Sequence, residues 1–308
     1  MTAQVYTFDD GGTEFTERIP PSDWSPATAT DAELQFFGYP ARPADASALS
    51  TWTQNWAAGY KATGVVYPCS GEDESSGLVR SAELDSYNWS GAVAEGGGFT
   101  EAYGMTTFNN GVGCSAQPDS YANWVGIGGK ASVGKLLQNG FWSDHLGGKS
   151  FPFWEAINPN HDTGTQPVSL SGIAFGDVFT ISTTYDPDTV TAHFGWHDVT
   201  SGVQYQLVTK TSIDGYSTAR YWDGSQAEVV DERGKIVDQI TTLRNFGSDP
   251  WTRAQVSVDS GNLVPLRSIS PHDGFFMVSN GVKISTPTSG TTTDAVTDNW
   301  HGCGVVNG

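Results

Sequence analysis

Short runs with a period of two dominate the chain after residue 82, and they constrain its fold more than any other feature. Polar and apolar residues alternate in these runs, and Gly, Asp and Asn separate one run from the next. Such alternation places one row of side chains on a core and the other on solvent, as in a half-buried β-strand. The clearest runs are 179–183, 190–194, 205–208 and 236–240. Many strands at close spacing predict an all-β fold, an antiparallel β-sandwich of two stacked, curved sheets.

The composition limits the class of protein and its partners. With 308 residues, 37% of them hydrophobic and 12% aromatic, the chain can bury a sizeable core, so we do not expect a disordered protein. The net charge of −19 repels nucleic-acid phosphates and anionic lipid headgroups. No apolar run is long enough to cross a bilayer. We therefore expect neither a nucleic acid nor a membrane as a partner, and we expect a monomer.

The first 80 residues differ from the rest. Leu49, Trp52, Trp56 and Tyr60 recur at helical spacing and predict a helix near 45–60. A shorter helix could begin in the stretch 30–34. The acidic, Ser/Gly-rich segment 70–81 reads as a linker. We therefore divide the chain into a small, partly helical extension, 1–80, and a sandwich domain, 82–308.

The chain has three cysteines, Cys69, Cys114 and Cys303, and no C-x-x-C pair. Neither a zinc ribbon nor a dithiol redox site is encoded, and one disulfide at most can form, in any of three pairings. The N-terminus lacks the basic and apolar stretches of a signal peptide, so the chain is either cytosolic or already trimmed. The acidic, Lys-poor composition favours a secreted protein, and we expect an extracellular location with the signal removed.

Several kinds of chemistry lack their motifs. Ser143 stands where a phosphate-binding loop ending at Lys149 needs glycine, and no Gly-x-Ser-x-Gly elbow occurs. His193 and His197 lie four apart in an extended run, which would separate them by roughly 13 Å, so we expect two ordinary strand histidines. Carboxylates and carboxamides flanked by aromatic residues remain.

These residues occur in short motifs with a definite order. The motifs are Asn88-Trp89-Ser90-Gly91-Ala92, Asn123-Trp124-Val125-Gly126-Ile127-Gly128-Gly129, Leu136-Leu137-Gln138-Asn139-Gly140, Phe153-Trp154-Glu155, Ala227-Glu228-Val229-Val230-Asp231-Glu232 and Asn245-Phe246-Gly247-Ser248. Their succession, from about Asn88 to about Leu266, resembles the eqolisin family of glutamic peptidases.

The resemblance implies an acid endopeptidase with a concanavalin A-like jelly roll and protein or peptide substrates. By matching position, Gln138 and Glu228 would be its catalytic pair, and no metal or organic cofactor is required. Trp89, Gly91, Trp124 and Glu155 would line the substrate groove, although core packing is an equal alternative for the two tryptophans. By the same resemblance, 1–80 would be a removable propeptide of a zymogen.

The chemistry of such a pair follows from its two side chains. A glutamate can take a proton from water and later return it to the departing amine, while a glutamine amide donates to the oxyanion and its carbonyl holds the water. We expect Glu228 to have an ordinary pKa of roughly 4.3 and to be ionised in mild acid. Because a carboxamide does not ionise, we also expect the pair to titrate simply.

The chain departs from the family pattern at four positions. Gly128 stands where the family usually has aspartate, so a hydrogen bond near the pair would be missing. Val229 replaces a tryptophan, and Ala156 and Ile157 replace a more aromatic run, so we expect a less aromatic cleft.

Three alternatives stay open. Eleven tryptophans and a legume-lectin-like sandwich would suit a carbohydrate-binding protein. A glycosidase could use Glu155 and Glu228 if their carboxyl groups lie about 5–10 Å apart. A catalytically inactive homologue is the third.

Overall fold

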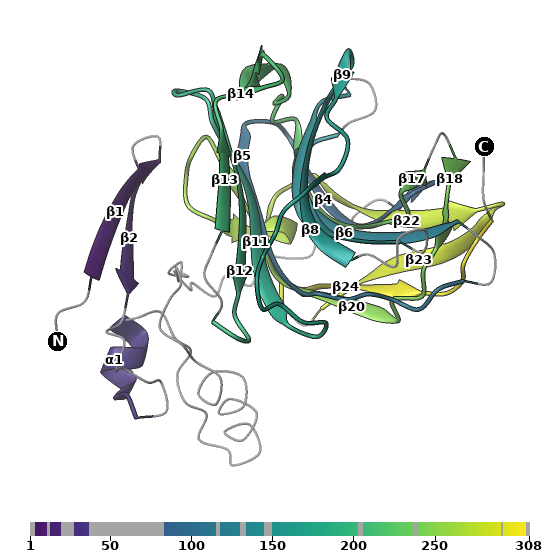
Figure 1. Cartoon of the computed structure of the whole chain (residues 1–308), viewed down its shortest axis with the longest axis horizontal. Coiled ribbons are helices and arrows are strands. Elements are labelled where there is room, and N and C mark those ends of the chain that lie inside the picture. The colour runs from purple at the N-terminus through teal and green to yellow at the C-terminus, as the bar shows by residue number, and fades with distance from the viewer. Residues whose placement is uncertain are drawn as a thin grey trace.

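The computed structural model describes residues 4–10, 13–19, 28–36, 83–114, 118–129, 134–144, 150–202, 206–236, 239–290 and 292–305. Almost all of its regular structure is β-strand (Figure 1). α1 (Asp31–Phe36) is the one α-helix in these ranges, and it has six residues. No helix of the described chain is therefore long enough to cross a bilayer.

Two antiparallel sheets pack face to face and form the predicted sandwich (Figure 1). Neighbouring strands of the first sheet, which carries the candidate site, follow the order β22, β4, β16, β6, β7, β8. Their bounds are His272–Ser279, Trp89–Glu95, Gln226–Glu232, Asp119–Gly128, Leu136–Asp144 and Ser150–Asn158.

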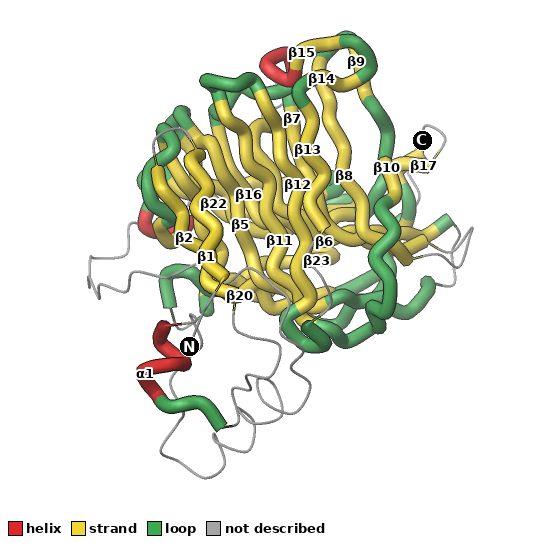
Figure 2. The backbone as a smooth tube through the Cα atoms, turned by 60° about the vertical axis from the view of Figure 1, so that its left-hand side comes forward, coloured by secondary structure: helices red, strands yellow, loops and turns green. Residues whose placement is uncertain are grey.

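Neighbouring strands of the second sheet follow the order β13, β12, β11, β5, β20, and most of them lie side by side in Figure 2. Their bounds are Gln206–Lys210, Thr191–Asp198, Val178–Asp186, Phe99–Thr107 and Ser248–Val258. β20 pairs with β5 in this sheet and with β24 (Val296–Trp300) of the first, so it connects the two sheets at one edge.

Shorter elements complete the fold. Beside the first sheet lie β3 (Glu83–Ser86), β9 (His161–Asp162), β10 (Gln166–Pro167), β19 (Thr242–Leu243) and β23 (Val282–Ser289). The remainder are β1 (Gln4–Asp10), β2 (Thr13–Ile19), β14 (Ser212–Ile213), β15 (Tyr216–Ser217), β17 (Lys235–Ile236), β18 (Gln239–Ile240), β21 (Val264–Pro265) and the 3₁₀ turns η2 (Thr218–Arg220) and η3 (Leu266–Ser268).

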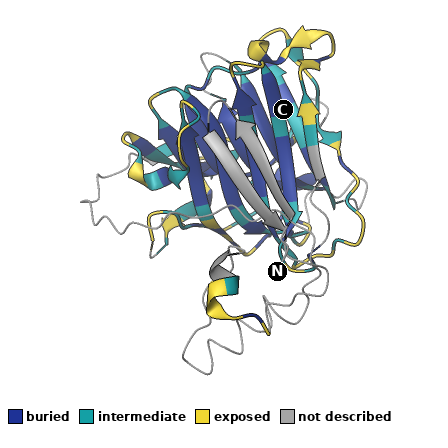
Figure 3. Ribbon diagram, turned by 90° about the vertical axis from the view of Figure 1, so that its left-hand side faces the viewer, coloured by how far each residue is buried: buried dark blue, intermediate teal, exposed yellow. Residues whose placement is uncertain are grey.

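The core lies between the two sheets, and the central strands are buried along most of their length (Figure 3). Val125, Ala227 and Val229 enter it from the first sheet, and Ile181 and Phe194 enter it from the second. Each alternates along its strand with residues on the opposite face, as the period of two predicted. The outer face of the first sheet is therefore the one that carries Glu228.

Most of the predicted local structure is present. The runs 179–183, 190–194 and 205–208 begin within one residue of β11, β12 and β13, and these strands end two to four residues beyond the predicted runs. The single strand predicted at 236–240 is wrong, because β17 and β18 pair there as a two-stranded hairpin. The hairpin of β1 and β2 was not predicted.

The short helix predicted after Thr30 is confirmed as α1. The Thr30 backbone N–H donates to Glu33 Oε2 at 2.6 Å, and the Glu33 N–H donates to Thr30 Oγ1 at 3.2 Å. These two reciprocal bonds form a capping box that starts the helix. The predicted helix near 45–60 and the linker 70–81 lie outside the described residues.

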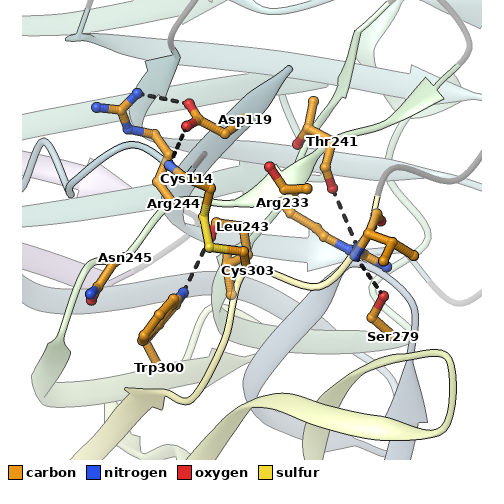
Figure 4. The surroundings of a disulfide bond; sticks show 12 residues. Cys114, Asp119, Arg233, Thr241, Leu243, Arg244, Asn245, Ser279, Trp300 and Cys303 are labelled. Carbon is orange, nitrogen blue, oxygen red and sulfur yellow. Dashed lines mark hydrogen bonds and ion pairs between the residues drawn. A yellow bond between two sulfur atoms is a disulfide. The ribbon is translucent and has the colours of Figure 1, made fainter. Parts of the chain in front are cut away.

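One of the three disulfide pairings is now assigned, because Cys114 is bonded to Cys303 across a sequence separation of 189 (Figure 4). The bond joins the segment before β6 to the end of the chain after β24. The Leu243 N–H donates to the Cys303 carbonyl at 2.8 Å, and the Cys114 N–H donates to Asp119 Oδ2 at 2.6 Å. The bridge thus fixes the C-terminal strand against the first sheet.

Candidate active site

Four residues of the first sheet lie directly opposite one another on adjacent strands. Glu228 of β16 pairs with Gly126 of β6, which pairs with Gln138 of β7, which pairs with Glu155 of β8. Directly opposed residues in antiparallel strands point their side chains to the same face. The sheet therefore brings the predicted pair, Gln138 and Glu228, together on one face, with Glu155 beside Gln138.

Gly126 leaves a gap between the two members of the pair. Because neighbouring strands lie about 4.8 Å apart, the Cα atoms of Glu228 and Gln138 are separated by roughly 10 Å. A Cβ atom at Gly126 would lie 3.1 Å from Glu228 Oε1 and 2.7 Å from Trp124 Cζ3. Because no side chain stands at Gly126, the Trp124 ring, Leu136 Cδ1 and Glu228 Oε1 can approach the backbone there.

Glu228 is fully buried, with 0% of its surface exposed. Gln226 Nε2 donates to Glu228 Oε2 at 3.1 Å, whereas Glu228 Oε1 has no hydrogen-bond partner among the described residues. Burial raises the pKa of the Glu228 carboxyl well above its ordinary range, the bond from Gln226 lowers it, and the charge of Asp223 raises it.

The predicted ordinary pKa of Glu228 is therefore wrong. The sequence shows a glutamate in a strand with polar residues but does not show that neighbouring strands exclude water from its carboxyl group. In the free site Glu228 keeps its proton in acidic solution. Since Gln226 donates to Oε2, this proton belongs on Oε1, the oxygen that borders Gly126.

Gln138 is also buried, with 4% of its surface exposed. Its Nε2 donates to Glu155 Oε2 at 2.9 Å, and its Oε1 is a second buried oxygen without a partner within the described chain. The row across β16, β6 and β7 thus holds two buried, unsatisfied oxygens on one face. Buried polar atoms usually have a partner, and a water bonded to both oxygens would satisfy them.

Aromatic residues surround the Glu228 end of the row. Trp124 is fully buried and half-buried Trp89 packs on it edge to face, with ring centroids 5.1 Å apart. A Cβ atom at Gly129 would lie 2.9 Å from Trp89 Cη2 and 3.5 Å from Glu228 Oε1, so Trp89 and the Glu228 carboxyl both border this glycine. The two tryptophans thus pack together and border the candidate site at once.

Gly91 has a packing reason to be glycine. It pairs with Val230, on the side of β16 that faces away from Gln138. A Cβ atom there would lie 2.1 Å from the Val229 carbonyl oxygen. Close approach of β4 to β16 therefore requires glycine at this position.

Sequence reasoning missed the role of Glu232, which shares the face of Glu228. Its carboxylate accepts hydrogen bonds from Trp124 Nε1 at 2.7 Å and from Asn88 Nδ2 at 2.9 Å. Burial raises its pKa to about 7, although these bonds lower it. The spacing of four residues in a strand was the signal that could have found it.

Asp162 of β9 was also missed. Burial raises the pKa of Glu155 to about 8, and the charges of Asp162 and Glu232 raise it as well. Asp162 follows the motif Phe153-Trp154-Glu155 by seven residues, and only the hairpin of β8 and β9 brings it back to Glu155.

Gly128 has a left-handed backbone, with φ +98°, and a Cβ atom there would lie 2.2 Å from the Lys135 carbonyl oxygen. Asp223 Oδ1 lies 3.4 Å from that Cβ position. The Asp223 carboxylate, from the loop before β16, thus borders the position that a Cβ atom at residue 128 would take. Its Oδ2 is buried and lacks a hydrogen-bond partner among the described residues.

The expected effect of Val229 and Ala156 on the cleft is wrong. Both are fully buried in the core between the sheets, because they occupy the alternate positions beside Glu228 and Glu155. Ile157 packs on the site face, with Trp124 and Phe153. Of the three substitutions, only Ile157 changes the aromatic character of that face.

A second group of carboxyls lies on the opposite face of β16. Asp231, Asp249 and Asp298 are all buried. Burial raises the pKa of Asp231 well above its ordinary range, and that of Asp298 to about 8, with the charge of Asp249 raising both. These carboxyls face the interior, so they are structural groups and not part of the row.

The described residues contain no group of three or more His, Cys, Asp and Glu side chains that could hold a metal ion. His193 and His197 lie on β12, as expected for an extended run, and His193 Nδ1 pairs with Thr209 Oγ1 at 3.2 Å.

Comparisons with known proteins give one family match and several structural matches. The sequence profile described as the peptidase A4 family matches residues 87–299. A crystal structure of scytalido-glutamic peptidase with a transition state analog inhibitor superimposes with a TM-score of 0.56, 21% identity, and coverage of 70% of this chain and 98% of that one. A second structure of that peptidase, with a peptide-based transition state analog, superimposes with a TM-score of 0.53 and 20% identity, and the match covers 70% of this chain and 98% of that one. At this identity the likeness shows the fold. A comparison with curated protein sequences found no match.

Proposed function

Because the chain belongs to the peptidase A4 family and is a glutamic-type acid endopeptidase, we propose that Glu228 and Gln138 are its catalytic pair. One observation carries the proposal. The two side chains face each other across Gly126 on one face of the sheet, and each has a buried oxygen with no partner in the described structure. In this proposal the attacking water is bonded to both oxygens.

Glu228 takes part in both halves of the reaction. As the water oxygen attacks the peptide carbonyl carbon, the carboxylate of Glu228 accepts the water proton. When the tetrahedral intermediate collapses, Glu228 gives this proton to the amide nitrogen, the C–N bond breaks and the carboxyl product leaves. Before the cycle begins, Glu228 must release to the solvent the proton that burial retains. Donors that a bound water and a peptide bring to Oε1 favour the carboxylate.

Gln138 stabilises the charge that forms on the peptide oxygen. One hydrogen of its Nε2 is used by Glu155, and the other is available to the developing oxyanion. Its Oε1 orients the water. Because the amide is neutral, it adds no charge that would oppose ionisation of Glu228.

The residues around the pair form the peptide site in this proposal. Trp89 and Trp124 border Glu228 and contribute apolar contacts, and Glu155 borders Gln138. Gly91 allows β4 to approach β16 closely. A glycosidase that uses Glu155 and Glu228 is disfavoured, because Gln138 stands between the two carboxyls in the row.

The chain is proposed to act outside the cell and to be made as a zymogen. The bond between Cys114 and Cys303 supports this location, because disulfides persist in oxidising compartments. The family match begins at residue 87, which is consistent with a separate role for 1–80 as a propeptide. N-terminal sequencing after incubation at about pH 3–4 tests whether 1–80 is removed.

Digestion of acid-unfolded haemoglobin tests the catalytic pair. Glu228→Gln and Gln138→Ala should each lower kcat/KM at least about 10²-fold, since each removes a group that acts on the transition state. Exposed Asp188 provides the control Asp188→Asn, which should retain full activity. Full activity of either site variant would exclude that residue from the pair.

A further inference from the structure

Glu155 contacts the amide of Gln138 and not the gap at Gly126. It lies on β8, directly opposite Gln138, and accepts the Gln138 Nε2 hydrogen bond at 2.9 Å. A glutamine amide can turn by 180° and exchange its oxygen and nitrogen. Whichever group faces Glu155 decides which group of Gln138 faces Glu228.

Asp162 lies on the same face, next to Glu155. β9 returns along β8 and places Asp162 directly opposite Ile157, two residues from Glu155 and therefore on its face of the sheet. The two acidic side chains are diagonal neighbours, a separation that long side chains bridge. The Gly164 N–H donates to Asp162 Oδ1 at 2.7 Å, so this oxygen is fixed as an acceptor.

The turn that carries Asp162 is held in place from outside the sheet. His161 Nε2 contacts Asp214 Oδ2 at 2.8 Å, and the His161 ring stacks on Tyr216 with centroids 5.6 Å apart. Arg220 covers the same Tyr216 ring, 5.1 Å from its centroid. These contacts join the end of β8 and β9 to the hairpin of β14 and β15.

Glu155 is surrounded by groups that keep it protonated. Asp162 of β9 and Glu232 of β16 are the charged groups that act on it, Gln138 of β7 is its donor, and burial disfavours its ionised form. A neutral Glu155 has one hydroxyl and one carbonyl oxygen. If the hydroxyl donates to Asp162, the carbonyl oxygen is left to accept from Gln138.

We propose that Glu155 and Asp162 are a positioning pair for the proposed catalytic pair. Asp162 accepts a hydrogen bond from the Glu155 hydroxyl, and the Glu155 carbonyl oxygen accepts one from the Gln138 N–H. The Gln138 carbonyl oxygen is thereby turned toward the gap at Gly126. This inference rests on the proposed role of Gln138. It assigns Glu155 a role that does not require contact with substrate. It assigns Asp162 the role of hydrogen-bond acceptor for Glu155.

Isosteric substitutions separate this positioning role from simple packing. In Glu155→Gln the amide nitrogen takes the place of the hydroxyl and the amide oxygen still accepts from Gln138, so kcat should fall less than in Asp162→Asn. In Asp162→Asn the Gly164 N–H keeps the amide oxygen on its own side, so the amide nitrogen points at Glu155. The Glu155 hydroxyl then donates to Gln138 instead, so the Gln138 amide rotates and its oxygen faces Glu155.

We therefore expect Asp162→Asn to lower kcat about 10-fold to 100-fold with KM changed less than about threefold, as for a misplaced catalytic group. Glu155→Gln combined with Asp162→Asn should be as poor as Asp162→Asn alone, because the amide introduced at 155 then turns its oxygen to the amide nitrogen at 162 and its nitrogen to Gln138. Asp188→Asn is the control, and the melting temperature of each variant shows that it is folded.

Wild-type kcat in Asp162→Asn, or an equal loss of kcat in Glu155→Gln and Asp162→Asn, would overturn the positioning pair. Gln138→Ala, measured in the same assay, distinguishes this failure from failure of the proposed function. If Gln138→Ala is inactive while Asp162→Asn is fully active, only the positioning pair is wrong. If Gln138→Ala is fully active, both proposals fail.

Discussion

Glu228 and Gln138 face the same glycine, Gly126, from opposite sides, and each has a buried oxygen without a hydrogen-bond partner among the described residues. β6, the strand between them, has no side chain at Gly126 itself, and the Trp124 ring of the same strand packs over that position. This arrangement lets two long side chains approach one small molecule without touching each other.

Gly126→Ala should remove activity because the added methyl group crowds the Glu228 carboxyl. The added methyl group would stand 3.1 Å from Glu228 Oε1 and 2.7 Å from Trp124 Cζ3. Trp124 and the Glu228 carboxyl must move to admit it, so kcat should fall at least about 10²-fold. Steady-state haemoglobin digestion and a thermal melt of the same sample measure the two effects. A folded variant with wild-type kcat would show that the gap is not used.

Gly128→Asp should not improve the enzyme, although it restores the residue that the family usually has. The φ of +98° strains any side chain, and the Cβ atom would lie 2.2 Å from the Lys135 carbonyl oxygen. Gly176→Asp is the matched control, because φ is +95° there and no atom lies within 4 Å. We expect the control to lose about 1–3 kcal/mol of stability and Gly128→Asp to lose more. Equal losses in urea unfolding would contradict this explanation.

Stability should fall as the pH rises from about 4 to about 8. The folded-state pKa of Asp298, about 8, lies above its unfolded value of 3.8, and the pKa of Asp231 is raised as well. The folded protein thus binds more protons than the unfolded chain in this window, and the slope of unfolding free energy against pH is negative. The contribution is fully present below pH 3.8 and is lost as the pH rises through the folded pKa, at about 1.4 kcal/mol for each unit.

Melting temperatures across this pH range test the stability prediction. Asp298→Asn keeps an acceptor for the Ser90 hydroxyl, which donates to Asp298 Oδ1 at 2.5 Å, but it cannot ionise. Its melting temperature should fall less with pH than that of the wild type. A wild-type melting temperature that rises from pH 4 to pH 8 would show that these carboxyls do not govern stability.

Breaking the bond between Cys114 and Cys303 should destabilise the domain. The bridge closes a long loop and fixes β24 against the first sheet, so Cys114→Ala should cost about 2–5 kcal/mol. Cys69→Ala leaves both bridged cysteines in place and is the control. A reductant should lower the melting temperature of the control and leave Cys114→Ala unchanged. Equal sensitivity of the two variants to the reductant would contradict the pairing.

Local pattern was enough to predict much of the fold, because alternation and capping depend on neighbours in sequence. β11, β12 and β13 follow from their period of two, and α1 follows from the bonds that Thr30 and Glu33 exchange. The segment 236–240 failed because an apolar run that folds back as a hairpin has the same composition as one strand.

The site was predicted in its residues and not in its electrostatics. Motif order placed Gln138 and Glu228 in one site, and the sheet register brings them onto one face. Burial depends on strands distant in sequence, so neither the raised pKa of Glu228 nor the proximity of Asp162 to Glu155 could be inferred. The disulfide partner was undetermined for the same reason, since β19 and β24 meet only in the folded chain.

A crystal structure of the enzyme in acidic solution tests the central claim most directly. The account predicts one ordered water in the gap above Gly126, within about 2.6–3.2 Å of both Glu228 Oε1 and Gln138 Oε1. Direct contact between these two oxygens, or a side chain filling the gap with no water bonded to either, would contradict it.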